Sequence, residues 1–203
     1  MKIGLVMNAK LLLVATFTSF TCTTRAAAPE KADAKASPPP TTDARPMQSA
    51  ESVKVGTFTF TVPEGWTKVT PSSAMRNAQL EIARGPAKAE VTFFHFGGGS
   101  GSVADNVARW FSQFAGTEGK GKTENVQVGS VKITFAMTEG TFSSGMPGGP
   151  TTPMTGYALC GAILESPQGD VYVKMTGPEA IVKEALVAFK KMVTDAASTA
   201  TRA

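Results

Sequence analysis

Residues 89–96 read Ala-Glu-Val-Thr-Phe-Phe-His-Phe, and this stretch decides the fold class. In an extended chain Val91 and Phe93 point to one side, whereas Phe94 and Phe96 point to the other. Apolar side chains on both faces are typical of a strand that other layers cover on both sides. The stretch therefore predicts a central strand with a covering layer on each face.

Further strands are expected on both sides of this stretch. Alternating apolar residues, or β-branched and aromatic content, mark six other segments. They are residues 58–62, 78–83, 124–128, 130–141, 157–166 and 171–176. Segment 78–83 is joined to 89–96 through Gly85 and Pro86, so these two should pair as a hairpin. The short connections predict a mainly antiparallel sheet of about six or seven strands.

Two segments have helical periodicity. In residues 102–115 the apolar residues recur at helical spacing, and Ser102 stands three residues before Asp105 as a capping pair. Gly116 is expected to end this helix. A second helix is expected over about residues 178–193, with its proline in the first turn. Helices at two separate points of the chain can cover both faces of the sheet, so the sequence predicts an α+β sandwich.

The start of the chain has the features of an export signal. Two lysines come first, the apolar stretch Leu11–Cys22 follows, and alanines stand at 26–28. This stretch is too short to span a bilayer. Cleavage after residue 26 would make 1–26 a signal peptide of a periplasmic or secreted protein. Lipidation of Cys22, which would anchor the protein to the membrane, and an uncleaved anchor remain alternatives.

Composition divides the rest of the chain. Residues 27–52 are rich in Ala, Pro, Lys, Asp, Ser and Thr and have almost no large apolar side chain, so we expect a disordered tether. A single globular domain is expected over 53–195 and a flexible tail over 196–203. Three of the 20 basic residues lie in the first 25 positions, so the remainder is nearly neutral, with 17 basic against 16 acidic residues. Such a balance does not fit a nucleic-acid binder.

Several short motifs carry a resemblance to known proteins. They are Gly65-Trp66, Met75-Arg76, Asn106-Val107-Ala108-Arg109-Trp110, Gln113-Phe114 and Lys174-Met175-Thr176-Gly177-Pro178. Together, over about residues 55–194, they resemble uncharacterised exported proteins of planctomycete-like bacteria. The order of strands and helices is similar to the PsbP-like fold, named for an extrinsic subunit of photosystem II. The first resemblance implies no catalytic residues, and the second implies binding or assembly roles rather than a particular chemistry.

The residues that most often carry chemistry are scarce. His95 is the only histidine, and Cys160 is the only cysteine after Cys22. One histidine and one cysteine are a poor ligand set for zinc or copper, so no metal and no cofactor is expected. Cys160 lies within an apolar strand, which predicts a buried and inert thiol. No serine, histidine and acid arrangement has independent support.

Two loops and two arginines remain as weak binding candidates. The glycine-rich run that contains Gly98, Gly99 and Ser100 stands between a strand and a helix, where backbone N–H groups can hold an anion. It lacks the ending of a nucleotide-binding loop, so a flexible connection is the simpler interpretation. The Pro- and Gly-rich loop 143–156 offers Met146 and Met154 as an adaptable contact surface.

Charged and aromatic residues within the motifs are more simply structural. Arg76 and Arg109 are candidates for binding, but Arg109 stands beside the apolar side of the first helix and should pair with a carboxylate. Trp66 and Trp110 are expected to anchor the core.

Three functions are compatible with these observations. The first is an exported, non-enzymatic binding or assembly module with an unknown protein or cell-envelope partner. The second is a carrier of a small ligand in a pocket between sheet and helix. The third is a hydrolase of unfamiliar type, for which no residue gives positive support.

Overall fold

The computed structural model describes residues 51–98, 100–117, 119–143 and 152–200. The expected signal peptide, Cys22, nearly all of the expected tether, Gly99 and Met146 therefore lie outside the described residues. The chain divides into two units, Met1–Arg45 and Pro46–Ala203, and the fold below belongs to the second. None of the helices in these described ranges is long and apolar enough to cross a membrane.

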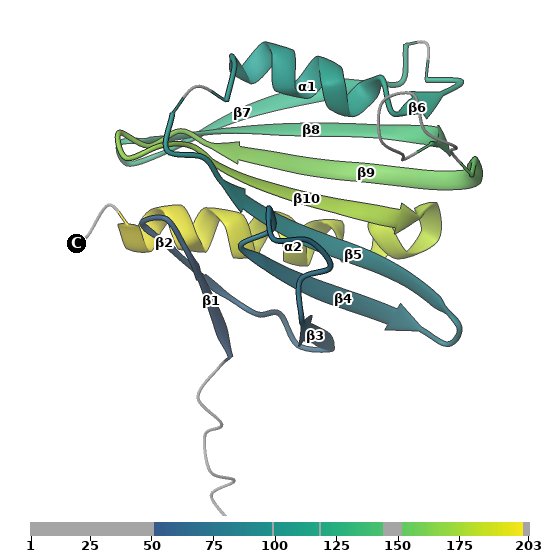
Figure 1. Cartoon of the computed structure of the whole chain (residues 1–203), viewed down its shortest axis with the longest axis horizontal. Coiled ribbons are helices and arrows are strands. Elements are labelled where there is room, and N and C mark those ends of the chain that lie inside the picture. The colour runs from purple at the N-terminus through teal and green to yellow at the C-terminus, as the bar shows by residue number, and fades with distance from the viewer. Residues whose placement is uncertain (1–50, 99, 118, 144–151, 201–203) are drawn as a thin grey trace, which may run out of the picture. The chain divides into compact units, whose positions relative to one another are not determined.

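The fold is built on an eight-stranded, antiparallel sheet (Figure 1). Its strands run in the spatial order β3-β4-β5-β10-β9-β8-β6, and β7 also pairs with β8. The strands are β3 (Trp66–Val69), β4 (Ala78–Arg84), β5 (Ala87–His95), β6 (Phe114–Ala115), β7 (Lys122–Val128), β8 (Val131–Phe142), β9 (Met154–Leu164) and β10 (Val171–Pro178). Two further strands, β1 (Ser52–Val55) and β2 (Phe58–Thr61), form a separate hairpin.

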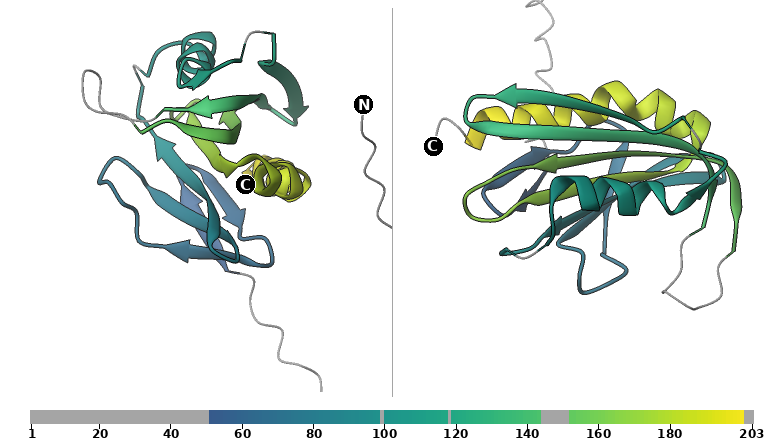
Figure 2. Two further views of the ribbon diagram at one scale, coloured as in Figure 1. Left: turned by 90° about the vertical axis from the view of Figure 1, so that its right-hand side faces the viewer. Right: turned by 90° about the horizontal axis from the view of Figure 1, so that it is seen from above.

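Two helices lie on opposite faces of the sheet (Figure 2). They are α1 (Val103–Phe111) and α2 (Glu179–Ala200). The side chains under α2 form the larger core, in which Phe93 of β5 and Phe189 of α2 are fully buried. The smaller core lies under α1 around Trp110 and Tyr172, and Phe94 packs against it. Strand β5 thus sends apolar side chains to both faces, which confirms the α+β architecture expected from residues 89–96.

The expected hairpin and capping pair are also confirmed. Strand β4 pairs with β5 in the register Leu80 to Val91, across the turn at Gly85. Ser102 caps α1, because its hydroxyl accepts the Asp105 N–H and the Asp105 carboxylate accepts the Ser102 N–H.

The bounds of both helices differ from the expectation. Helix α1 ends at Phe111 rather than near Gly116, and Phe114 belongs to the short strand β6. Phe114 remains in the α1-side core, because a side chain in β6 reaches Phe142 on the neighbouring strand β8. Helical spacing of apolar residues therefore predicted the burial of Phe114 correctly, but it did not predict the strand conformation of its backbone.

Helix α2 begins and ends later than expected. Pro178 is the last residue of β10, where it pairs with Tyr157, and the helix begins at Glu179. It continues to Ala200, and Ala196 and Ala197 are buried. The expected flexible tail over 196–203 is therefore wrong for residues 196–200, because small apolar side chains there continue the packing face.

The start of the domain and the strand count also need correction. Ser52, expected in the tether, begins β1, whose Val53 and Val55 are buried in the core. Strands β1, β3 and β6 were not foreseen, because they are only two to four residues long and lack the Phe-Thr alternation that marks the equally short β2. The main sheet has eight strands instead of about six or seven.

Candidate functional site

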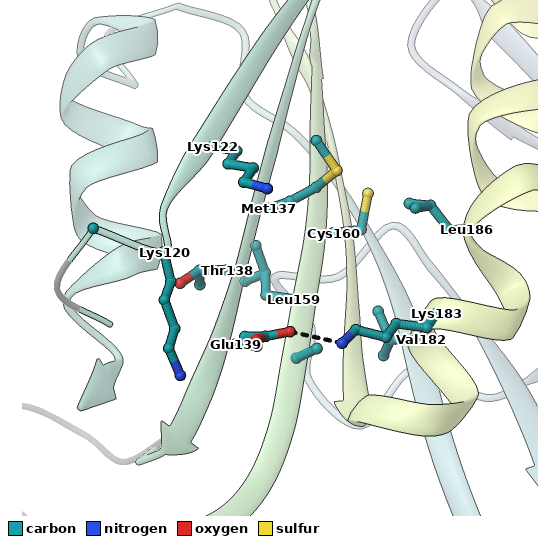
Figure 3. Close-up of a pocket in the computed structure, with 12 residues that line it drawn as sticks. Lys120, Lys122, Met137, Thr138, Glu139, Leu159, Cys160, Val182, Lys183 and Leu186 are labelled. Carbon is teal, nitrogen blue, oxygen red and sulfur yellow. Dashed lines mark ion pairs between the residues drawn. The ribbon is translucent and has the colours of Figure 1, made fainter. Parts of the chain in front are cut away.

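A pocket of about 380 Å³ lies between α2 and one end of the sheet. We call it the lysine-rimmed pocket (Figure 3). Its lining comes from the start of β7 and the segment before it, from β8 and β9, and from the first turns of α2. The lining residues are Gly119, Lys120, Lys122, Met137, Thr138, Glu139, Ala158, Leu159, Cys160, Val182, Lys183 and Leu186.

The apolar floor of this pocket follows from the strand register. Met137 of β8 pairs with Cys160 of β9, so both side chains lie in one row of the α2-side face. Val182 and Leu186 stand one helical turn apart on α2 and close the floor from the other side. Thioether, thiol and branched aliphatic groups together form a surface suited to a hydrocarbon group.

The rim carries three lysines and one glutamate. The Nζ of Lys183 lies 2.9 Å from Oε2 of Glu139, and Lys183 also contacts Glu179 one turn earlier in α2. The hydrogen bond and charge of Lys183 lower the pKa of the Glu139 carboxyl, and the charges of Lys120 and Lys122 act in the same direction. The only carboxylate among the described residues of the lining is therefore ionised and already paired.

Lys120 and Lys122 differ from Lys183 in having no ion pair among the described residues. Within the described part of the chain neither side chain has an ion-pair partner, and Figure 3 shows both on the strand side of the pocket, across from Lys183. Two lysines beside an apolar floor create a positive potential at the mouth, since Glu139 and Glu179 both pair with Lys183 and no described carboxylate pairs with Lys120 or Lys122.

Cys160 closes the floor without offering a reactive group. Its side chain is buried, which confirms the sequence prediction, and burial raises the pKa of the thiol to about 12. The nearby Lys190 lowers the pKa of Cys160 and Glu124 raises it, but both are smaller effects than burial. The neutral thiol thus behaves as part of the apolar floor.

The two candidate arginines have structural partners. Arg76 donates from Nη1 to Oε2 of Glu90 at 3.0 Å and to Oε1 of Gln79 at 2.9 Å. Arg109 donates to Oδ1 of Asn106 within α1. The expectation of a carboxylate partner for Arg109 is therefore wrong: among the described residues its hydrogen bond goes to an amide oxygen, because Asn106 stands one turn earlier in α1.

The glycine-rich run is held in place by side chains. Ser100 shares a hydrogen bond of 2.7 Å with the Tyr172 hydroxyl, and the side-chain amide of Asn106 donates to the Ser100 carbonyl at 2.9 Å. Gly98 and Ser100 line a hollow together with Asp170, and the Asp105 carboxylate caps the adjacent helix. Two carboxylates at this place do not favour an anion, and Gly99 lies outside the described residues.

Histidine and methionine candidates are located as follows. His95 ends β5, and its Nε2 lies 3.2 Å from the carbonyl oxygen of Gln168. Within the described ranges no group of three or more His, Cys, Asp or Glu side chains gathers closely enough to hold a metal ion. Met154 begins β9 and packs against the α1-side core.

The pocket was not predicted from the sequence. Its rim combines Lys120 and Lys122 with Glu139 from β8 and Lys183 from α2, which are far apart in the chain. The one local signal is the Gly-Lys-Gly-Lys run at 119–122. Such a run reads as a turn, and only the fold brings it opposite α2.

No family model matches the chain, and no curated protein matches it. Among solved structures, a Pseudomonas aeruginosa protein of unknown function, described as a putative regulator, matches 71% of this chain and 93% of its own. The identity is 14% and the TM-score 0.38. The cyanobacterial PsbP of Synechocystis matches 68% of this chain and 84% of its own, with 10% identity and a TM-score of 0.40. The second neighbour has the fold named by the sequence resemblance, and similarities at this level carry no function to this chain.

Proposed function

We propose that this chain is an exported, non-enzymatic binding module of the bacterial cell envelope, and that it holds an amphipathic organic anion in the lysine-rimmed pocket. The observation that carries the proposal is the combination of an apolar floor with the lysines Lys120 and Lys122, which have no ion-pair partner within the described residues. Pockets that bind small molecules are typically apolar with a few well-placed polar groups.

The binding mode follows from the geometry. A hydrocarbon group would lie against Met137, Cys160 and Leu186, where each buried methylene stabilises the complex by about 0.8 kcal/mol. A carboxylate or similar anionic group would face Lys120 and Lys122. The Glu139–Lys183 ion pair joins β8 to α2, so Lys183 is already paired and the anion would meet the other two lysines.

A binding role is favoured over a catalytic one by the chemistry of the lining. Nucleophilic catalysis by cysteine needs a thiolate, whereas burial keeps the Cys160 thiol protonated. The paired carboxylate of Glu139 is fixed by Lys183. These groups support recognition of a ligand rather than its conversion.

Export rests on the N-terminal sequence. The proposal includes cleavage after residue 26 and a tether over about 27–50, with lipidation of Cys22 as the alternative form. Intact-mass measurement of protein recovered from its native cells tests it. A mass that lacks residues 1–26 supports soluble export, and a diacylglyceryl group on Cys22 selects the lipoprotein. A mass that still includes residues 1–26 would contradict cleavage.

Ligand binding is tested with octanoate as the probe. Calorimetric titration of the purified full chain should show saturable binding of octanoate and much weaker binding of octylammonium, which has the same chain and the opposite charge. Lys120→Gln combined with Lys122→Gln should weaken octanoate binding about tenfold, equivalent to about 1.4 kcal/mol. Lys68→Gln, which removes an exposed lysine on β3, serves as the matched control and should leave binding unchanged.

A second variant tests the apolar floor. Leu186→Phe should fill part of the pocket and weaken octanoate binding without changing any charge. Thermal melts of each variant show whether the fold is retained. Equal affinity for octanoate and octylammonium, or binding that survives both the lysine and the leucine substitutions, would overturn the proposal.

A further inference from the structure

A second hollow lies on the opposite face of the sheet from the lysine-rimmed pocket. It measures about 270 Å³, and its lining includes Gln79, Glu90, Phe142, Met154, Tyr157 and Thr176. We call it the Thr176 hollow. On β10, Tyr172 belongs to the α1-side core, and side chains alternate along a strand, so Thr176 points to that same side. Helix α1 packs over β8, β9 and Tyr172 of β10, which leaves the part of this face formed by β4, β5 and the Thr176 end of β10 uncovered by the helix.

Thr176 provides the first indication of a ligand. The residue is 6% exposed, and its hydroxyl oxygen, which exposes less than 1 Å² to solvent, has no hydrogen-bond partner among the described residues. A buried hydroxyl without a partner loses its hydration and gains nothing in return. Because Thr176 lines the hollow, rotation about its χ1 would turn this hydroxyl toward a ligand, and a ligand hydroxyl would then supply the missing partner.

The polar side chains around the hollow are held in fixed positions. Oε2 of Glu90 accepts from Nη1 of Arg76 at 3.0 Å and from Nε2 of Gln79 at 3.3 Å. Arg76 also donates to Oε1 of Gln79. The planar carboxylate and the planar amide are therefore oriented before any ligand arrives, which reduces the entropy lost on binding.

Each charged side chain of this lining is already in an ion pair. Arg76 pairs with Glu90, and Lys88 pairs with Glu81 at 2.9 Å. An ionic ligand would have to compete with one of these pairs, whereas a neutral ligand with hydroxyl groups can donate to the carboxylates and leave both pairs intact.

The other side of the hollow is aromatic. The rings of Phe142 and Tyr157 are stacked, with an interplanar angle of 8° and centroids 6.1 Å apart. Met154 lies beside them in the lining. An aromatic wall opposite fixed hydrogen-bonding groups suits a ligand with an apolar face and a polar edge.

We propose that the Thr176 hollow binds a neutral sugar unit, either free or as part of a glycan. The C–H face of a pyranose ring would lie on Tyr157, its hydroxyls would reach Glu90 and Gln79, and one hydroxyl would pair with Thr176. Arg76 and Met154, both candidates from the sequence, then serve this hollow: Arg76 positions Glu90, and Met154 forms part of the wall. The proposal is independent of the lysine-rimmed pocket.

The test uses the full chain and ligand-observed NMR titrations. The probes are D-glucose, D-galactose, D-mannose and N-acetyl-D-glucosamine, each free and as a tetrasaccharide, with D-glucuronate and D-glucosamine as charged counterparts. At least one neutral probe should bind saturably, and more tightly than its charged counterparts. Binding of the free sugar indicates a soluble ligand, and binding of the tetrasaccharide alone indicates a glycan.

Three variants separate ligand binding from folding. Tyr157→Ala should weaken binding at least fivefold. Thr176→Val keeps the shape of the side chain and removes its hydroxyl, so it should weaken binding about threefold or more without lowering the melting temperature. Thr134→Val is the control for binding and should leave it unchanged, because Thr134 is a buried threonine that lines neither this hollow nor the lysine-rimmed pocket. Absence of binding by every neutral probe, or binding unchanged in both Tyr157→Ala and Thr176→Val, would overturn the proposal.

Discussion

Gly161 and Trp110 illustrate how single residues position the α1 layer. Trp110 is 6% exposed, as its place on the apolar side of the helix predicted. The glycine beneath it could not be interpreted from the sequence, where it is one residue in an apolar strand. A Cβ built on Gly161 would lie 2.2 Å from Cζ3 of Trp110, so the absence of a side chain there allows the indole ring to rest on β9.

This pair gives a prediction at the residue scale. Trp110→Ala should lower the free energy of unfolding by about 3 to 5 kcal/mol, because burial is lost and a cavity remains. Gly161→Ala should lower it by about 1 to 3 kcal/mol through overpacking. In the Trp110→Ala background the same glycine substitution should cost much less, because its obstacle has been removed. Denaturant unfolding of the two single variants and the double variant measures these differences.

Additive effects would contradict this arrangement. If Gly161→Ala costs the same free energy with and without the indole ring, then Trp110 does not rest on β9. An unchanged unfolding midpoint for Trp110→Ala would further show that the ring is exposed.

At the scale of elements, the end of α2 shows that a helix packed through small apolar residues is hard to recognise in the sequence. Met192, Val193, Ala196 and Ala197 follow one another at helical spacing and are all buried. The sequence from residue 194 onward is rich in Ala, Ser and Thr, and composition alone suggested a flexible tail. The periodicity was present but weak, because alanine contributes little hydrophobic signal.

A charge test distinguishes a packed helix end from a tail. Ala197→Asp should lower the free energy of unfolding by about 3 kcal/mol or more, because it buries an unpaired carboxylate. Val187→Asp makes the same kind of change at a position of α2 that is 79% exposed, and should stay within about 0.5 kcal/mol. Thermal or denaturant unfolding measures both. Equal, small effects would restore the interpretation of a tail.

Strand β1 makes a similar point at the other end of the domain. Val53 and Val55 are buried, and the backbone carbonyl of Glu51 accepts the Val62 N–H at 2.7 Å. Alternation over so few residues next to a polar segment gives too weak a signal to place a strand. The same holds for the short strands β3 and β6.

Two deletions locate the boundary of the domain. Removal of residues 27–50 should leave the melting temperature unchanged, because that segment offers almost no large apolar side chain. Removal of residues 27–55 should destabilise the domain by about 3 kcal/mol or more, because two buried valines are lost. Equal melting temperatures for the two deletions would show that β1 contributes nothing. A lower melting temperature for the shorter deletion would show that residues 27–50 pack against the domain.

Functional residues were the least predictable part of the sequence. The lysine-rimmed pocket unites Lys120 and Lys122 with Glu139 and Lys183, none of which stands in a motif. Of the weak candidates, Arg76 and Met154 do lie together at the Thr176 hollow. In the sequence Arg76 stands in one of the motifs and Met154 in the Pro- and Gly-rich loop, which made both residues candidates. Only the strand register brings β4 and β9 to the two sides of one hollow.

At the scale of the whole molecule, two buried groups on opposite faces of the sheet set the pH dependence of stability. Burial lowers the pKa of Lys174 to about 8 from its ordinary 10.5, and Arg76 and Arg109 add to this while Glu90 opposes it. Cys160 changes in the other direction, from 9.0 to about 12, because burial disfavours its thiolate.

The expected profile follows from these directions. As the pH rises above about 8, folded Lys174 releases its proton while the unfolded chain still holds it, so stability rises, by about 1 kcal/mol up to pH 9. Above pH 9 the unfolded chain loses the Cys160 proton that the folded state retains, which opposes the continuing effect of Lys174. Because the two effects nearly cancel between about pH 9 and pH 10, urea unfolding should show a stability that rises from about pH 8 and then levels off.

Variants assign the two limbs of this profile. Lys174→Met should remove the rise and leave a fall above about pH 9, and Cys160→Ala should let the rise continue toward pH 10. Lys68→Met, at an exposed position, should leave the profile unchanged. A rise that persists in Lys174→Met would show that another group titrates in this range.

The strand order has a consequence for how the molecule reaches its folded state. The central strand β10 is the last strand to be synthesised, and it joins β5, about eighty residues earlier, to the β9 and β8 side of the sheet. Neither half can close onto the other until nearly the whole chain has left the ribosome. Contacts between such distant parts of a chain slow folding, because a long loop must be ordered before they form. The growing chain should therefore stay open and accessible to chaperones throughout most of its synthesis.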